Sequence, residues 1–138
     1  MPELPEVETV MRGLAPVLSG QVIKDVALGD KGLRIPFPKG LSDRLMGTKI
    51  DRLERRAKYI FAYLNNDSIL AIHLGMSGRI RILAPQANSM PELHDHFGLT
   101  LEDGHKIILN DARRFGMVFD FLVNDFANHK AFSHLGPE

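Results

Sequence analysis

The sequence contains no cysteine, and this absence excludes disulfides, thiolate zinc sites and cysteine nucleophiles together. It carries no net charge either, because 17 Lys and Arg residues offset 17 Asp and Glu residues. Dedicated nucleic-acid-binding domains are usually basic, so the total charge does not indicate one. Long apolar runs are also missing: the longest is interrupted at His73 and Gly75, well short of the roughly 20 residues that span a membrane.

Targeting signals and repeats are absent as well. The amino terminus has neither the basic nor the apolar segment of a secretory signal, and no internal repeat or low-complexity tract is visible. A length of 138 residues, with 44% hydrophobic and 25% charged residues, is typical of one globular domain with a proper core. We therefore expect a soluble cytoplasmic protein that does not associate with membranes.

The charges that are present are concentrated locally, and local charge bears on binding more directly than the sum does. Two basic clusters stand out, and acidic residues near the amino terminus and scattered Asp residues offset them. The basic residues are Arg52, Arg55, Arg56 and Lys58 in the first cluster and Arg113 and Arg114 in the second; the acidic ones are Glu3, Glu6 and Glu8.

The first predicted element is an amphipathic helix. Pro5 suits its first turn and Gly20 the position just past its end. Apolar residues recur at three- and four-residue spacing and therefore share one face. These residues are Val7, Val10, Met11, Leu14 and Leu18.

Strand patterns follow the helix. Asp103-Gly104 is a strong hairpin signal, and residues 49–64 form the longest strand candidate because aromatic and aliphatic residues alternate there. We expect an α+β, mainly β fold: a two-layer antiparallel sandwich, or a flattened barrel, of about eight strands with the amino-terminal helix and a second short helix. The expected strands cover 21–28, 49–64, 68–74, 79–83, 96–101, 105–109 and 116–123; helical turns cover 41–46 and 125–134, and 30–40 is a loop with room for a short edge strand.

Pro2 is a candidate nucleophile. Once Met1 is removed, Pro2 presents a secondary amine at the start of a helix, and a neutral amine attacks a carbonyl-like carbon to give a Schiff base. An α-amino group titrates at about 8, so an appreciable fraction is neutral near physiological pH. While Met1 is attached, this nitrogen is an amide and cannot react. Taken alone, the opening residues are more simply explained as a common start followed by the helix-opening Pro5.

Several motifs in fixed order along the whole chain change that interpretation. The chain opens with MPELPEVET and closes with HLGPE, and the motifs between them are RRAKY at 55–59, HLGMSG at 73–78, HDH at 94–96 and DARRFG at 111–116. Together they resemble the formamidopyrimidine-DNA glycosylase family: the opening resembles the start of family members, and HLGPE resembles the point where their first domain ends.

The resemblance implies a bifunctional DNA glycosylase and abasic-site lyase that removes oxidised purines from double-stranded DNA in base-excision repair. Pro2 would attack C1′ of the damaged nucleotide and displace the base. Glu3 would assist opening of the sugar ring, a role in which the carboxyl must first lie within hydrogen-bond distance of the reacting oxygen, and only then does its pKa matter. Lys58 would contact phosphate and take part in the later strand-cleaving elimination. Without the motif, Lys58 would be read as an exposed strand lysine.

The resemblance also implies a DNA-contacting surface. Met76, Arg113 and Phe115 would fill the gap left by an extruded base, with Arg113 facing the orphaned cytosine; proteins that extrude a base use such side chains as wedges. His73, His94 and Arg113 would line the DNA backbone, which gives affinity with little sequence preference. In isolation, Met76 and Phe115 would be read as core residues and Arg113 as a solvated arginine. His94 and His96 alternate as metal ligands could, but no further ligands are supplied, so we expect no metal here.

The sequence departs from the family pattern in three respects. Met11 stands where the family commonly has arginine, and Ala112 where it commonly has proline. The helix–two-turn–helix domain and the cysteine-ligated zinc finger of family members do not appear in residues 1–138, which we interpret as the amino-terminal catalytic domain. The single structural zinc of the family would belong to that missing part, and we expect no cofactor in this chain and little or no glycosylase activity from it alone.

Two alternatives remain open. One is an endonuclease VIII-type glycosylase, which prefers oxidised pyrimidines and shares Pro2, Glu3 and the lysine; Leu4 and the run from Arg113 to Phe115 favour the first assignment. The other is a non-catalytic module that only holds damaged DNA. For the full-length family member, the resemblance implies a monomer without obligate protein partners, located in the bacterial cytoplasm and associated with the nucleoid.

Overall fold

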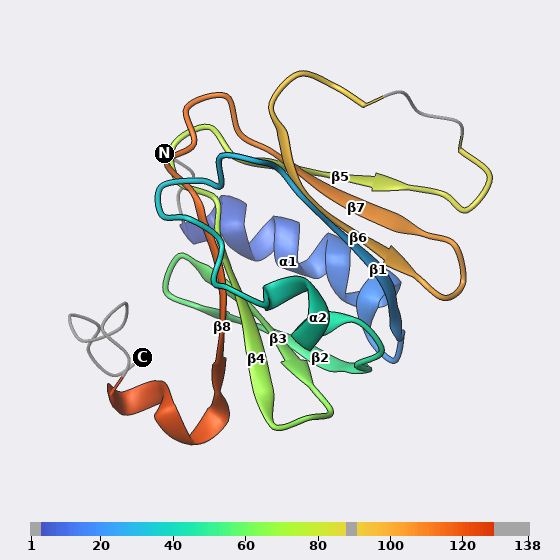
Figure 1. The fold of residues 1–138 in the computed structure, drawn as a ribbon, viewed down its shortest axis with the longest axis vertical. Coiled ribbons are helices and arrows are strands. Elements are labelled where there is room, and N and C mark those ends of the chain that lie inside the picture. Colours follow the sequence, from blue (N-terminus) through green and yellow to red (C-terminus); the bar gives the residue numbers. More distant parts are fainter. Residues whose placement is uncertain (1–3, 88–90, 129–138) are drawn as a thin grey trace.

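Two antiparallel four-stranded sheets form the fold in the computed structural model, which describes residues 4–87 and 91–128 (Figure 1). The strand order is β1-β6-β7-β5 in one sheet and β2-β3-β4-β8 in the other. This is the expected two-layer sandwich. The elements are α1 (Leu4–Leu18), β1 (Ile23–Leu28), α2 (Leu41–Leu45), β2 (Ile50–Arg56), β3 (Tyr59–Leu64), β4 (Ser68–His73), β5 (Arg79–Leu83), β6 (Asp95–Leu101), β7 (Lys106–Asn110), β8 (Met117–Leu122) and the 3-10 helix η1 (Val123–Asn128).

The amino-terminal helix forms where the periodicity predicts it. Its apolar stripe joins the core shared by the two sheets: Val7, Leu14 and Leu18 are buried, and two further apolar residues of the stripe are partly buried against them. The chain leaves the helix through Gly20, which has φ of 82°, a conformation that glycine adopts without steric cost. Within the described part of the chain, no helix is long and apolar enough to cross a membrane.

The sheet β2-β3-β4-β8 is apolar on both faces, because successive side chains of a strand alternate between the faces. One face contributes Ile60 and Leu70 to the core between the sheets. The other carries an aromatic cluster in which the rings of Phe61 and Phe121 meet edge to face, with centroids 5.6 Å apart. The buried members of this cluster are Tyr59, Phe61, Ile69, Ala71, Phe119 and Phe121.

The prediction of one long strand over residues 49–64 is wrong. The chain turns back at Ala57 and Lys58, so that β2 and β3 pair as a hairpin with Arg56 opposite Tyr59. The turn has no glycine or asparagine to announce it, and Ala57 takes φ of 52°, which is uncommon for a residue with a side chain. The alternating pattern continues across the turn and therefore conceals it.

Two smaller expectations also need correction. The helix expected over 125–134 is η1, which begins at Val123 and reaches Asn128; residues 129–134 lie outside the described residues. The described segment 30–40 contains no strand, because its backbone bonds elsewhere: the Arg34 N–H donates to the Gly116 carbonyl at 3.0 Å. The short helix α2 and the hairpin at Asp103-Gly104 are confirmed.

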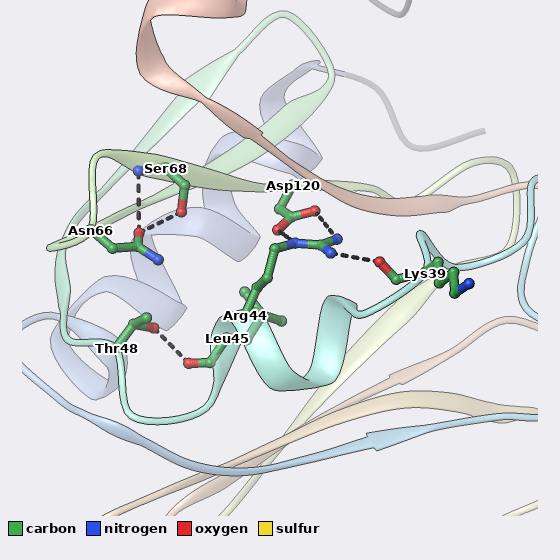
Figure 2. A network of polar contacts seen from close by, with 7 residues as sticks. All are labelled: Lys39, Arg44, Leu45, Thr48, Asn66, Ser68 and Asp120. Carbon is green, nitrogen blue, oxygen red and sulfur yellow. Dashed lines mark hydrogen bonds and ion pairs between the residues drawn. The ribbon is translucent and has the colours of Figure 1, made fainter.

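A network of polar contacts fastens α2 to β8 (Figure 2). The Arg44 guanidinium donates from Nε and Nη2 to the two carboxylate oxygens of Asp120, at 2.7 and 2.8 Å, and from Nη1 to the Lys39 carbonyl. The Asp120 side chain is only 8% exposed, so this paired arrangement satisfies an otherwise buried charge. The bridge anchors β8, the strand that directly follows residues 111–116.

Candidate nucleic-acid interface

Two loops of the candidate site leave the same end of one strand pair. Strands β4 and β8 are paired with His73 opposite Met117. Residues 74–78 follow β4, and residues 111–116 precede β8. The motifs that carry Met76 and Phe115, which are far apart in sequence, therefore meet at one end of the sandwich.

Glycines allow the backbones of these loops to touch. A Cβ added to Gly75 would lie 2.5 Å from the Gly116 nitrogen, and one added to Gly116 would lie 2.5 Å from the His73 carbonyl oxygen. Gly75 also has φ of 64°. Only glycine meets both the spatial and the conformational requirement at this position.

The Asp111 carboxylate holds the two loops together. It is fully buried, at 0% exposure. One carboxylate oxygen accepts hydrogen bonds from the Ser77 hydroxyl at 2.6 Å and the Arg114 N–H at 3.1 Å, and the other accepts from the Gly116 N–H at 2.8 Å. The Ser77 hydroxyl oxygen in turn accepts from the Arg113 N–H at 3.2 Å. A single buried side chain thus fixes the backbone on both sides of the exposed Phe115.

Asp111 also connects the histidine motif to this end of the fold. Its main-chain N–H donates to the His94 carbonyl at 3.0 Å, and its own carbonyl lies 3.0 Å from Nε2 of His96. Strand β6 begins at Asp95, and His94 lies before it with φ of 72°. The exposed His94 therefore belongs with the two loops at 74–78 and 111–116, together called the loop cluster, rather than to the sheet.

Apolar side chains project outward from the loops. Met76 is 47% exposed and Phe115 is 42% exposed, and the Arg113 guanidinium carbon lies 5.3 Å from the centre of the Phe115 ring, a cation–π distance. A pocket of about 380 Å³ is lined by Arg34, His73, Gly75, Met76 and Phe115. Exposed apolar groups beside cations suit a ligand that has both flat rings and negative charge.

His73 lies half-buried at the end of β4. Burial lowers its pKa, and the nearby charges of Arg34 and Lys58 lower it further. The Gly75 N–H donates to its Nδ1 at 3.0 Å, so this nitrogen is the unprotonated one. At neutral pH His73 is therefore a neutral ring that can donate only from Nε2.

Lys58 lies in the β2–β3 turn, beside Tyr59, which pairs with His73. Pro2 and Glu3 lie outside the described residues, directly before the first residue of α1. All the other candidate residues, Lys58, His73, Met76, His94, Arg113 and Phe115, come together at this end of the sandwich. In the part of the chain that is described, no group of three or more potential metal ligands gathers, and with no cysteine in the sequence a cysteine-ligated zinc site does not fit this chain.

Sequence reasoning assigned no role to three residues that shape this site. Asp111 and Ser77 lie within the motifs at 111–116 and 73–78, and the available signal was a polar residue in a motif that also contains glycine. Arg34 had no such signal, because it lies in a loop whose position depends on the contact with Gly116. Loop residues of this kind are placed by tertiary contacts rather than by local pattern.

Comparison with known proteins decides the family. The family model of the formamidopyrimidine-DNA glycosylase N-terminal domain matches residues 1–118. The chain belongs to this family. It is 45% identical to the formamidopyrimidine-DNA glycosylase of Cereibacter sphaeroides strain ATCC 17029 and 46% identical to that of Dinoroseobacter shibae, over its whole length and 51% of each relative. The chain thus spans about half the length of the curated relatives it matches.

Solved structures of this family match the fold closely. The formamidopyrimidine-DNA glycosylase of Lactococcus lactis, non-covalently bound to DNA with an abasic site, superposes with a TM-score of 0.86 at 29% identity, over 99% of this chain and 51% of that one. Further structures of the Lactococcus protein contain DNA with a formamidopyrimidine lesion or an oxidised pyrimidine. The two-sheet architecture described above is therefore the family's amino-terminal domain fold.

Proposed function

We propose that this chain is the catalytic amino-terminal domain of a DNA glycosylase and abasic-site lyase that repairs oxidised purines in double-stranded DNA. Membership of the family is the observation that carries the proposal. The exposed Met76 and Phe115, fixed next to Arg113 by a buried carboxylate, support it, since solvent-exposed apolar groups on a rigid loop suit insertion into a base stack.

The reaction begins at Pro2 once Met1 has been removed. The Pro2 nitrogen forms a bond to C1′ with its lone pair, and the bond from C1′ to the damaged base breaks, so that the base leaves with that electron pair. The nitrogen loses its proton, and the departing base takes up a proton in exchange. Glu3 then supplies a proton to the ring oxygen as its bond to C1′ opens, which leaves an iminium between Pro2 and C1′. Lys58 contacts the phosphate and assists the elimination that cleaves the strand.

The loop cluster handles the extruded nucleotide. Met76, Arg113 and Phe115 occupy the vacated position in the stack, and Arg113 pairs with the orphaned cytosine, for which its planar, multi-donor guanidinium is suited. His73, His94 and Arg113 contact the DNA backbone. A neutral His73 serves as a hydrogen-bond donor from Nε2 rather than as a cation.

Borohydride trapping tests this proposal, because reduction of the iminium leaves a stable covalent adduct. We expect the native polypeptide that contains this chain, with Pro2 as its first residue by mass spectrometry, to give an adduct with a duplex bearing 8-oxoguanine opposite cytosine. Pro2→Gly should weaken or abolish the adduct, whereas Pro85→Gly, in an exposed loop, should not. A protein that retains Met1 should give none. Failure of the correctly processed protein to form an adduct would refute the assignment.

A parallel assay with oxidised pyrimidines separates the two glycosylase types. We expect faster excision of 8-oxoguanine and formamidopyrimidines than of oxidised pyrimidines; the reverse order would favour the endonuclease VIII type. Binding of damaged duplex without any excision would favour a non-catalytic module. In bacteria, the class of organism that carries the relatives named above, such an enzyme works on the nucleoid in the cytoplasm, with the helix–two-turn–helix and zinc-finger parts supplied by sequence outside this chain.

A further inference from the structure

Arg55 links α1 to the β2–β3 turn, two segments whose relative position matters for the proposed chemistry. It lies next to the end of β2, and its Nε–H donates to Oε1 of Glu8 on α1 at 2.8 Å. Its Nη1 donates to the Ala57 carbonyl at 2.9 Å. The arginine side chain is 25% exposed and the Glu8 side chain 31% exposed, so both ends of this bridge are partly screened from water.

The carbonyl that Arg55 holds belongs to the peptide bond between Ala57 and Lys58. Ala57 takes φ of 52°, a left-handed conformation that is sterically unfavourable for a residue with a side chain. Strained backbone at a functional position persists only where the surroundings hold it. The guanidinium supplies such a hold directly before Lys58.

Glu8 provides the other end of the connection. It lies in α1, the helix that Pro2 and Glu3 directly precede in the chain. Glu8 has a second cationic partner, Arg12, at 3.0 Å, but this pair lies along the helix surface and the Arg12 side chain is 77% exposed. Arg12 therefore offers a matched comparison: it binds the same carboxylate without reaching the turn.

We propose that Glu8 and Arg55 form a positioning bridge that sets the Lys58 turn relative to the amino-terminal end of α1. This inference rests on the proposed function, in which Pro2 and Lys58 act on one nucleotide. Neither bridge residue touches the reacting atoms in this role. Misplacing one catalytic group by about 1 Å costs on the order of 100-fold in rate, so a bridge of two hydrogen bonds is sufficient to matter.

The test measures single-turnover borohydride trapping on the native polypeptide with a damaged duplex, across DNA concentrations. Glu8→Gln and Arg55→Gln should lower the trapping rate at saturating DNA by about 10- to 100-fold, with the half-saturating DNA concentration changed by less than about threefold. Arg55→Lys should be intermediate, because one ammonium cannot reproduce the two directed bonds. Arg12→Gln should stay within about twofold of the wild type, as expected for an exposed pair.

The outcomes separate this inference from the function on which it rests. If the wild type forms no adduct, or Pro2→Gly traps as well as the wild type, the proposed function fails. If the wild type traps and Pro2→Gly does not, yet Glu8→Gln and Arg55→Gln match Arg12→Gln, the positioning bridge is refuted alone. A rise in half-saturating DNA concentration at unchanged maximal rate would refute it too, since that result assigns Arg55 to direct phosphate contact. Should Arg55→Gln fail to fold, Glu8→Gln, which alters the slightly more exposed partner of the bridge, decides.

Discussion

Replacing Asp111 with asparagine tests how the interface loops are held. The carboxylate is fully buried and accepts from the Ser77 hydroxyl, the Arg114 N–H and the Gly116 N–H. Asparagine has the same shape but presents an amide NH₂ group, a hydrogen-bond donor, in place of one carboxylate oxygen. Whichever oxygen is replaced, an N–H then faces a main-chain N–H, that of Arg114 on one side or that of Gly116 on the other.

The magnitude follows from the kind of bond that is lost. A hydrogen bond to a charged group contributes about 1.5–3 kcal/mol, and a buried donor without a partner costs about 1–3 kcal/mol. Some relaxation of the loop offsets part of the sum. We therefore expect Asp111→Asn to lower the free energy of unfolding by about 3 kcal/mol, which corresponds to a Tm lower by roughly 10 °C in a domain of this size.

Urea titration followed by circular dichroism at pH 7.5 measures this effect. Asp51→Asn is the control, because it removes the same charge at an exposed position of β2 and should change stability by less than about 0.5 kcal/mol. A loss below about 1 kcal/mol for Asp111→Asn would refute the reasoning, since the loops would then be held without the carboxylate. Affinity for abasic-site duplex, measured under conditions where the variant is folded, should fall as well, because the same bonds fix Arg113.

Three further predictions concern single contacts. Burial lowers the pKa of His73 in the folded protein, so protonation of this histidine favours the unfolded state. Its titration therefore does not affect the free energy of unfolding above the ordinary histidine pKa of about 6.5, and lowers that free energy as pH falls from there through the lower folded pKa. When urea unfolding is compared at pH 7.5 and 5, His73→Gln should lose less stability than the wild type. Gly75→Ala should destabilise by about 2–4 kcal/mol, from the left-handed backbone and the clash with Gly116, and an unchanged Tm would contradict the close loop contact. Arg44→Met should cost about 1–2 kcal/mol by leaving Asp120 unpaired, and the loss should shrink in an Asp120→Asn background, where equal losses would argue against the bridge.

Much of the fold follows from local pattern. The apolar stripe of α1, the Asp103-Gly104 hairpin and the strand ranges were predictable because each depends on residues close in sequence. The β2–β3 turn was not predictable in this way. Neither Ala57 nor Lys58 is a residue typical of turns. The alternating apolar pattern continues on both sides of the turn, so the change of chain direction is seen only in the pairing of β2 with β3.

The residues of the site could be predicted from the sequence, but the hydrogen bonds that hold them in place could not. Motif residues such as Met76 and Phe115 were identified from resemblance, yet nothing in their spacing indicates that Asp111 bonds the loops that carry them. Nor does spacing indicate that Glu8 and Arg55 meet, since they belong to different elements. Hydrogen bonds between distant segments arise only once the chain has folded, which is why these positioning residues emerge from the structure.

The zero net charge of the chain does not argue against DNA binding once the positions of the charges are known. Acidic residues can cancel the formal charge of the chain without cancelling the local field at an interface, if they are paired elsewhere. Asp120 in β8 is bound by Arg44, and other arginines bind further carboxylates. Among the ion pairs of the described residues, none includes Arg34 or Arg113, the two arginines beside the exposed Phe115. The proposed DNA-contacting surface is therefore locally basic, although the sum over the chain is zero. The other arginine–carboxylate pairs given by the described residues include Arg52–Glu54, Arg81–Glu92, Arg81–Asp95, Arg12–Glu8 and Arg55–Glu8.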